Sequence, residues 1–317
     1  MTNKEKYRKL CETEESIPVF SRDWWLDAVV GESNWDVIIV ERDRQIIAVL
    51  PFVKSKKFIF DILSMPKLTQ TLGPWIKYPK GQKYANKLSF EKEMFTKLID
   101  GLPLNHYFSQ NLHPSITNWL PFYWKGFSQT TRYTYIINEL TDTKDIYSSF
   151  QSKIRTDIRK AEKNIKIIES EDVNEFYKIN SLTFSRQGID TPYSLDFVKK
   201  LDKACKANKC RKIFFALDEK DRIHSVLYLV WDQEFAYYLM GGSDSELRNS
   251  GSMSLLLWHA IQFSGAVTKA FNFEGSMIEP IERFVRGFGA QQVPYFNISK
   301  TNSKLLLARE ALLKISK

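Results

Sequence analysis

The sequence predicts an α/β (α+β) fold of two similar units in tandem, each with a mixed, mainly antiparallel sheet flanked by helices. Residues 48–63, AVLPFVKSKKFIFDIL, align without a gap with residues 225–240, SVLYLVWDQEFAYYLM, at an offset of 177. Another apolar strand and a charged turn precede each segment, VIIVERDRQ in the first half and IFFALDEKDR in the second. Each half therefore has the strand and turn pattern that is typical of an antiparallel meander.

The elements around the two meanders repeat as well. A helical pattern precedes each meander, at 21–30 and at 173–184, and a second one follows each, at 84–100 and at 252–265. Another apolar strand comes next in both halves, and a closing helix is expected at 302–315. We expect an N-terminal unit at 1–140 that is non-catalytic and a C-terminal unit at 141–317 that carries the site.

The composition indicates a globular chain with an anionic partner or simply a soluble surface. Of the 317 residues, 43% are apolar, which allows a dense core. No apolar run is long enough to span a bilayer, and the three cysteines form no zinc spacing, so we expect a cytoplasmic protein without an integral membrane segment. Lys and Arg number 46 against 37 acids, a net charge of +9. Such a charge favours phosphorylated molecules, RNA or lipid headgroups, and it is equally compatible with solubility alone.

The segment that joins the halves, IYSSFQSKIRTDIRKAEK at 146–163, predicts one amphipathic helix. Its apolar residues recur at fourfold spacing and form a stripe, whereas basic residues crowd the remaining surface. A solvated helix face and an anion-binding surface both fit this pattern. The stripe consists of Ile146, Phe150, Ile154 and Ile158, and the bases are Lys153, Arg155, Arg159, Lys160 and Lys163.

A strand in the second half ends in Gly241 and Gly242, and a polar loop then opens an apolar helix. Glycines at a strand end permit a bulge or the close approach of a ligand to the backbone. The loop at 248–252, RNSGS, puts free backbone N–H groups at a helix N-terminus, where phosphate or carboxylate can bind. Ordinary helix capping explains the same loop and is the simpler interpretation.

The segment FNFEGSMIEPIERFVRGFGA, at 271–290, places Glu274 at the end of a buried strand. We expect this strand, 269–273, to lie beside the strand that ends in glycines. A carboxylate there can accept a proton from an attacking amine. It can also cap a helix that begins near Ser276, or pair with Arg283 or Arg286.

Other catalytic systems lack their motifs. The sequence has four histidines without HExxH spacing, no GxSxG elbow, and neither a GxGxxG nor a Walker loop. We therefore expect no metal site and no covalent intermediate. The remaining chemistry is direct attack of an amine on an activated acyl group that backbone donors hold in place.

Several of these segments together resemble the Fem-like branch of the GNAT acyltransferase superfamily. They are SKIRTDIRKAEKNIKI, SLTFSRQGIDTPYS, the strand that ends in glycines, and FNFEGSMIEPIERFVRGFGA. The resemblance covers about 145–299 well, and the first half mainly by its order of elements. It implies tandem GNAT folds in which an acyl donor and an acceptor meet around the second. The donor would be acyl-CoA or an aminoacyl-tRNA, and the acceptor a small molecule or a glycan precursor.

The resemblance also implies roles for individual residues. The backbone of Met240, Gly241 and Gly242 would polarise the acyl carbonyl, and Glu274 and Tyr238 would handle protons. The GNAT loop that grips the pyrophosphate of coenzyme A corresponds to Arg248-x-x-Gly251-x-Met253, where Met253 replaces a small residue; a tRNA donor would not need that loop intact. Donor-binding residues would be Arg248, Ser250, Gly251 and Ser252, and acceptor-binding residues Arg155, Arg159 and Arg186.

The sequence thus favours an N-acyl or aminoacyl transferase that acts on an amine in the cytoplasm. This amine would belong to a cell-envelope or glycan precursor, such as that of peptidoglycan. The alternative is a non-catalytic module on a degenerate GNAT fold that binds RNA, tRNA included, or a phosphorylated ligand. A third, weaker alternative is docking on anionic lipid through the basic surface.

Overall fold

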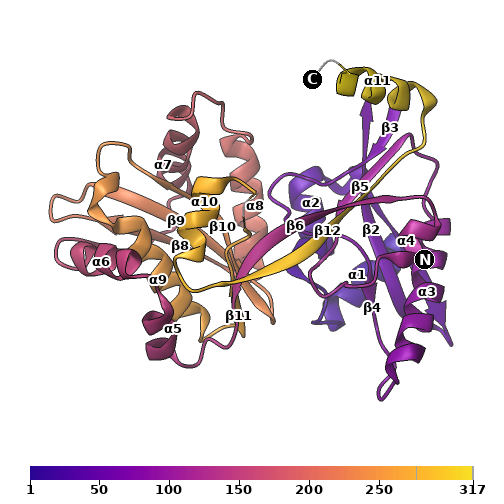
Figure 1. Cartoon of the computed structure of the whole chain (residues 1–317), viewed down its shortest axis with the longest axis horizontal. Coiled ribbons are helices and arrows are strands. Elements are labelled where there is room, and N and C mark those ends of the chain that lie inside the picture. The colour runs from indigo at the N-terminus through magenta and orange to yellow at the C-terminus, as the bar shows by residue number, and fades with distance from the viewer. Residues whose placement is uncertain (276, 316–317) are drawn as a thin grey trace. The chain divides into compact units, whose positions relative to one another are not determined.

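The structure is a computed structural model that describes residues 1–275 and 277–315, without the side chains of Arg248 and of residues 310–315. The chain forms two compact units (Figure 1). The first unit comprises Met1–Arg132 and Pro294–Lys317, and the second comprises Tyr133–Val293. The polypeptide passes from one unit to the other within strands β6 (Ser128–Ile137) and β12 (Gln291–Thr301). None of the described helices is long and apolar enough to cross a membrane.

The first unit contains a sheet in the order β1-β2-β3-β5-β12, with β4 paired to β2. Its core lies between this sheet and helices that include α1, α2 and α3. The elements are α1 (Asn3–Thr13), η1 (Val19–Ser21), α2 (Asp23–Val30), η2 (Glu32–Asn34), β1 (Trp35–Arg42), β2 (Gln45–Lys57), β3 (Phe60–Leu63), β4 (Trp75–Ile76), α3 (Tyr84–Asp100), β5 (Tyr107–Asn111), α4 (Leu120–Trp124) and α11 (Lys304–Ile315).

The second unit contains a sheet in the order β6-β11-β10-β9-β8-β7. Its strands pair antiparallel except for β10 and β11, which are parallel. The elements are α5 (Thr143–Ser149), α6 (Ser152–Ala161), β7 (Lys166–Glu169), α7 (Val173–Ser185), α8 (Leu195–Ala207), β8 (Arg211–Leu217), β9 (Ile223–Trp231), β10 (Phe235–Ser243), η3 (Arg248–Ser250), α9 (Ser252–Ser264), β11 (Ala270–Asn272) and α10 (Glu279–Arg286).

Helices cover both faces of the second sheet, because successive strand residues point to opposite sides. Phe214 and Leu227 belong to a core shared with residues of α5, α6, α9 and α10. Tyr228, the next residue along β9, contacts the ring of Phe176 in α7 at 5.6 Å and donates a hydrogen bond to Asp202 in α8 at 2.9 Å. Helices α7 and α8 therefore lie on one face, and α9 lies with α6 on the other.

The repeated order of elements predicted from the sequence is confirmed, but the alignment of 48–63 with 225–240 is not a structural match residue by residue. Both β1-β2-β3 and β8-β9-β10 are antiparallel meanders. In the first hairpin Lys54 pairs with Leu63, so the offset of 177 would pair Trp231 with Met240. Trp231 pairs instead with Ala236. The turn of the second hairpin lies two residues earlier relative to this alignment, and the position of the turn sets the register of a hairpin.

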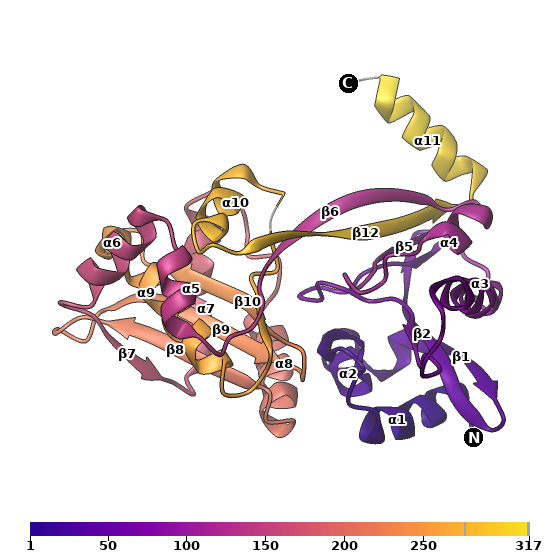
Figure 2. The same cartoon turned by 60° about the horizontal axis from the view of Figure 1, so that its bottom comes forward.

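The single helix predicted over 146–163 is wrong: the structure has two helices, α5 and α6, with a break between them (Figure 2). Phe150 has an extended backbone, and the N–H of Gln151 donates to the carbonyl of Gly287 at 2.8 Å rather than to the preceding turn. The hydroxyl of Ser149 donates to the carbonyl of Ile146 at 2.7 Å. This side-chain hydrogen bond competes with the backbone hydrogen bonds that would continue the helix. The apolar stripe of Ile146, Phe150, Ile154 and Ile158 is nevertheless buried throughout.

Ile158→Ala is expected to lower the free energy of unfolding of the second unit by about 2–5 kcal/mol, because Ile158 is fully buried in its core. Thr156→Ala, on the exposed side of the same helix, is expected to change it little. Urea denaturation followed by circular dichroism measures both. Equal small effects would contradict the packing of α6 into this core.

Candidate active site

The candidate site is centred on β10, which lies between β9 and β11. On one side β10 pairs with β9 from Ala236 to Ser243. On the other side it pairs with β11 only over the three residues from Phe235 to Tyr237. Strand β11 ends at Asn272, so beyond Tyr237 the described part of the chain places no strand along this side of β10. We call the side of β10 from Leu239 to Gly242 the open margin.

A β-bulge marks the beginning of the open margin. Tyr238 lies opposite Leu229 whereas Met240 lies opposite Tyr228, so Leu239 is an extra residue on β10. Bulges bend the strand and redirect its backbone groups. The predicted carbonyl-polarising residues, Met240, Gly241 and Gly242, follow the bulge directly.

Helix α7 holds the open margin through Asn180. The side-chain amide of Asn180 donates to the carbonyl of Gly241 at 2.7 Å, and its oxygen accepts from the hydroxyl of Tyr193 at 2.9 Å. Gly242 approaches the helix so closely that an added Cβ would lie 2.6 Å from the Cα of Asn180. Since the N–H and C=O of a residue in an antiparallel strand point to the same side, the N–H of Gly241 also faces the open margin.

Tyr238 lies across Gly241 on the other face of the strand. A Cβ on Gly241 would overlap the phenol of Tyr238, so this position requires glycine. The hydroxyl of Tyr238 points to the sulfur of Met253 at 3.9 Å, and burial raises its pKa to about 12. Tyr238 is therefore protonated at neutral pH and can donate a proton or a hydrogen bond.

Glu274 follows β11 in a left-handed backbone conformation, with φ of 57°, and Gly275 continues it with φ of 58°. The N–H of Glu274 donates to Asn272 Oδ1 at 2.8 Å, which fixes this turn. Although the residue as a whole is half-buried, its Oε1 is shielded from solvent and has no hydrogen-bond partner among the described residues. Desolvation raises the pKa of Glu274 well above its ordinary value of 4.5.

The charge of Glu274 acts on the tyrosines around it. Its proximity contributes to the raised pKa values of Tyr193 and Tyr237, for which burial is the main cause. Neither of the structural roles considered for Glu274 appears among the described residues: α10 begins only at Glu279, and Arg286 pairs with Glu282 at 2.8 Å. Ser276, where the helix was expected to begin, lies outside the described residues.

The predicted donor loop forms η3 and the start of α9. Gly251 has φ of 79°, and a Cβ there would overlap the carbonyl oxygen of Asp157 in α6. The hydroxyl of Ser252 is buried and hydrogen-bonded to Ser225 at 2.7 Å, whereas Ser250 Oγ accepts from the N–H of Ser252 at 3.4 Å. The side chain of Arg248 lies outside the described residues. The loop thus rests on α6, and its serines serve local structure as well as any ligand.

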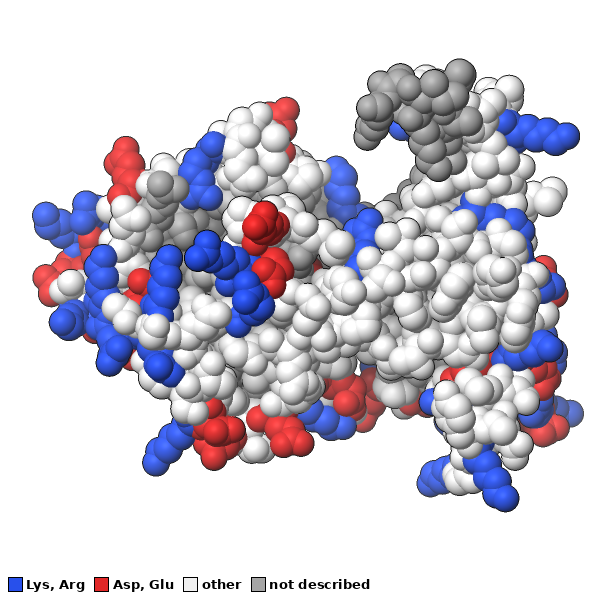
Figure 3. Space-filling view, viewed as in Figure 1, with Lys and Arg blue, Asp and Glu red and all other residues white. Residues whose placement is uncertain are grey.

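The three arginines implied in acceptor binding lie on two elements. Arg155 and Arg159 are in α6. The guanidinium of Arg155 donates to the carbonyl of Ser148 at 2.6 Å, and that of Arg159 donates to the backbone carbonyl of Arg155 at 3.3 Å. In the same helix Lys160 donates to the carbonyl of Asn249 in the donor loop at 2.6 Å. Lys and Arg side chains gather around α6 on the surface (Figure 3). Arg186 instead ends α7, on the opposite face of the sheet.

The sequence reasoning missed Asn180 and Tyr193. A signal for Asn180 existed: it stands on the buried side of α7, four residues after Phe176 and directly after Ile179. A polar residue on an apolar face needs a partner, and a buried Asn is therefore a candidate for holding a backbone group. Tyr193 carried no such signal, because only the fold brings its loop to α7.

Asn180→Leu is expected to lower the free energy of unfolding by about 1–3 kcal/mol, because it leaves the carbonyl of Gly241 and the hydroxyl of Tyr193 without their partner. Asn174→Leu, on the exposed side of the same helix, is the matched control. Urea unfolding compares the two variants. A loss no larger than that of the control would contradict the role of Asn180.

Glu274→Gln is expected to stabilise the fold more at pH 8 than at pH 4. The folded state keeps the proton of Glu274 above the ordinary pKa of 4.5, whereas the unfolded chain releases it. Stability therefore falls as the pH rises from that value through the raised pKa, and glutamine removes this loss. Urea unfolding of both proteins at the two pH values measures the difference. A pH-independent difference would contradict the raised pKa.

Comparison with known proteins agrees with this geometry. The sequence model described as an acetyltransferase (GNAT) domain matches residues 148–266, which include α6, β8 to β10 and α9. No curated protein sequence matches the chain.

Solved structures match nearly the whole chain at low sequence identity. The crystal structure of FemX superposes with a TM-score of 0.68 at 12% identity, over 93% of this chain and 96% of FemX. The C-terminal domain of a putative lysylphosphatidylglycerol synthetase from Agrobacterium fabrum gives 0.58 at 13% identity, over 99% and 97%. L-PGS from Bacillus licheniformis gives 0.53 at 12% identity, over 98% and 94%. The resemblance inferred from the sequence is thus confirmed: residues 148–266 match the acetyltransferase (GNAT) domain model, and the chain shares its fold with FemX.

Proposed function

We propose that the chain is an N-acyl or aminoacyl transferase that moves an activated acyl group, from a CoA thioester or an aminoacyl-tRNA ester, directly to an amine. The observation that carries the proposal is the open margin: β10 and β11 stop pairing after Tyr237, and the N–H of Gly241 faces the side of β10 along which the described residues place no strand. Preorganised N–H groups aimed at a developing oxyanion supply much of the acceleration in acyl transfer.

The reaction needs no covalent enzyme intermediate. The lone pair of the acceptor amine attacks the acyl carbon, and the carbonyl oxygen gains negative charge beside the N–H of Gly241. The tetrahedral intermediate then collapses, the C–S or C–O bond breaks, and the thiolate or the ribose oxygen leaves. The amine loses one proton and the leaving group gains one, so the site needs a base and an acid.

Glu274 and Tyr238 fit these two tasks. A carboxylate with a raised pKa is a stronger base than an exposed one, and it lies at the turn after β11 where the strands separate. Tyr238 stays protonated near neutral pH and lies over Gly241, so it can protonate the leaving group.

The start of α9 and helix α6 would hold the anionic part of the donor. The N-terminus of α9 favours phosphate, and α6, which carries Arg155, Arg159 and Lys160, packs against α9 and bonds to the preceding loop through Lys160. On this proposal Arg155 and Arg159 serve the donor rather than the acceptor. Arg186, at the end of α7, stays a candidate for acceptor binding.

We place the site in the second unit, Tyr133–Val293, and give the first unit, Met1–Arg132 with Pro294–Lys317, a non-catalytic role. The acceptor class that the Fem-like resemblance favours is an amine on a cell-envelope or glycan precursor, peptidoglycan above all, in the cytoplasm. One of the structural neighbours is named as a putative lysylphosphatidylglycerol synthetase, which favours an aminoacyl donor.

A second candidate is a non-catalytic module that binds RNA or a phosphorylated ligand. The basic surface of α6 favours it (Figure 3). Filter binding across a salt series tests it, because phosphate contacts make the affinity fall steeply with salt. RNA binding without transfer from any donor would favour the module over the enzyme.

Glu274→Gln is expected to lower kcat by about 10²–10⁴-fold, the range for loss of a general base. The wild type should show activity that rises with pH through the raised pKa of Glu274, and the variant should lack this rise. Mass spectrometry of candidate amines incubated with acyl-CoAs or charged tRNAs measures the product. Glu219→Gln, in an exposed turn, is the control. Full activity of Glu274→Gln would remove Glu274 from the mechanism.

A further inference from the structure

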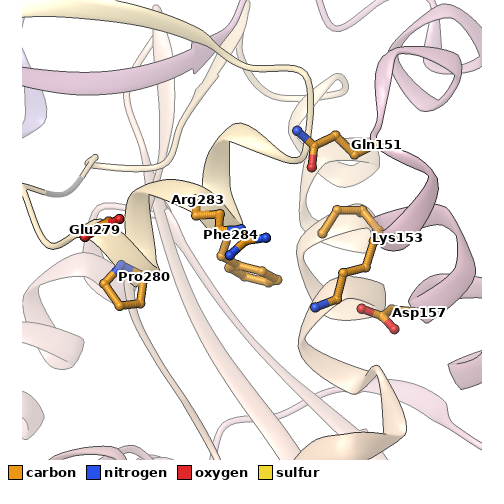
Figure 4. Close-up of a pocket in the computed structure, with 8 residues that line it drawn as sticks. Gln151, Lys153, Asp157, Glu279, Pro280, Arg283 and Phe284 are labelled. Atoms are coloured by element: carbon orange, nitrogen blue, oxygen red, sulfur yellow. The ribbon is translucent and has the colours of Figure 1, made fainter.

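A pocket of about 700 Å³ lies between α6 and α10 in the second unit (Figure 4). Lys153 and Asp157 lie on its α6 wall, and Glu279, Arg283 and Phe284 on its α10 wall. The side chains of Arg283 and Phe284 extend from α10 toward α6. The proposed transfer chemistry gives none of these residues a role.

The charged side chains around this pocket have no partners among the residues that the structure describes. Lys153, Asp157, Glu279 and Arg283 form no ion pair or side-chain hydrogen bond with any other described residue. Elsewhere on α10 charges are paired, as Arg286 is with Glu282 at 2.8 Å. The pocket thus presents two cationic and two anionic groups, all available to a ligand.

An aromatic ring lies between these charges. Phe284 is half-buried, and its ring meets the buried ring of Phe288 edge to face, with centroids 5.4 Å apart. This contact holds the ring of Phe284 in place, so that it can serve as a stacking surface.

The pocket adjoins the donor loop. Gly251, at the start of α9, packs against the carbonyl of Asp157, a residue that also lines the pocket. A donor whose phosphates lie at the start of α9 would therefore extend its remaining part toward this pocket.

We propose that the pocket binds a nucleoside phosphate, the chemical group that coenzyme A and the 3′ end of a charged tRNA have in common. This inference rests on the proposed function. The base stacks on Phe284, phosphate oxygens accept from Lys153 and Arg283, and ribose hydroxyls donate to Asp157 and Glu279. A free amino acid would satisfy both charges but fill little of the volume, and an inorganic anion would face two carboxylates.

Calorimetric titration tests the inference without any transfer reaction. The probes are adenosine 3′,5′-bisphosphate and an RNA hairpin that ends in CCA, at about 0.15 M salt to screen distant charges. Phe284→Leu and Arg283→Gln are expected to weaken binding of at least one probe about tenfold or more. Lys163→Gln, which removes an exposed charge near the same helix outside the pocket, should bind like the wild type.

The two probes separate the sources of the nucleotide. Binding of the bisphosphate alone identifies a CoA donor, and binding of the hairpin alone identifies a tRNA donor. Absence of binding at millimolar concentration, or wild-type affinity in both variants, would overturn the inference. Arg283 is exposed, so its substitution keeps the test valid even where Phe284→Leu disturbs folding.

Kinetics distinguish a failure of the pocket from a failure of the proposed function. With acetyl-CoA, Phe284→Leu should raise KM about tenfold at unchanged kcat, whereas acetyl-4′-phosphopantetheine, which lacks the nucleoside, should be used equally by both proteins. Variant-sensitive binding in a wild type that transfers no acyl group would support the pocket and refute the transferase.

Discussion

The separation of β10 from β11 after Tyr237 is the constraint on which the rest of the second unit depends. Two strands that pair over three residues and then part leave backbone groups that need other partners, because buried unpaired amides and carbonyls are costly. Asn180 satisfies the carbonyl of Gly241 from α7. The turn at Glu274 and Gly275, with φ near 57° at both, leads the chain away from β10. Gly275 is required there, because a Cβ would overlap the backbone of Tyr133 and Thr134.

Charge is distributed around this opening in a way that suits acyl transfer. Glu274, Tyr193 and Tyr238 all have raised pKa values, because burial near the open margin disfavours their ionised forms. The cations lie on α6, against the start of α9. A permanently ionised carboxylate at the opening would repel an anionic donor, whereas a neutral one admits the donor and becomes a base once it loses its proton.

The order of elements could be predicted from the sequence because apolar periodicity and turn residues are local signals. The same holds for the strand that ends at Gly241 and Gly242 and for the strand that leads to Glu274. What could not be predicted depends on partners distant in sequence. The break before α6 depends on the hydrogen bond from the N–H of Gln151 to the carbonyl of Gly287. The position of the open margin depends on the hydrogen bond from Asn180 to the carbonyl of Gly241. Whether Glu274 is buried or paired is likewise decided by the fold, since the sequence supplied Arg283 and Arg286 as equally good partners.

The first unit has the same meander followed by a parallel strand, yet it lacks the opening. There β3 pairs with β5 through Ile62 and Leu63 and ends at Leu63, so no length of strand continues past the paired segment. The chain that follows stays with β5: the sulfur of Met65 accepts from the N–H of Asn111 at 3.4 Å, and the N–H of Leu72 donates to the carbonyl of Asn111 at 2.8 Å. The backbone groups at the end of β5 are thus satisfied within the unit. The carbonyl of an acyl group needs backbone N–H groups that are free to donate a hydrogen bond between two parting strands. Of the two meanders, the second has such an opening. This difference supports placing the transfer reaction in the second unit.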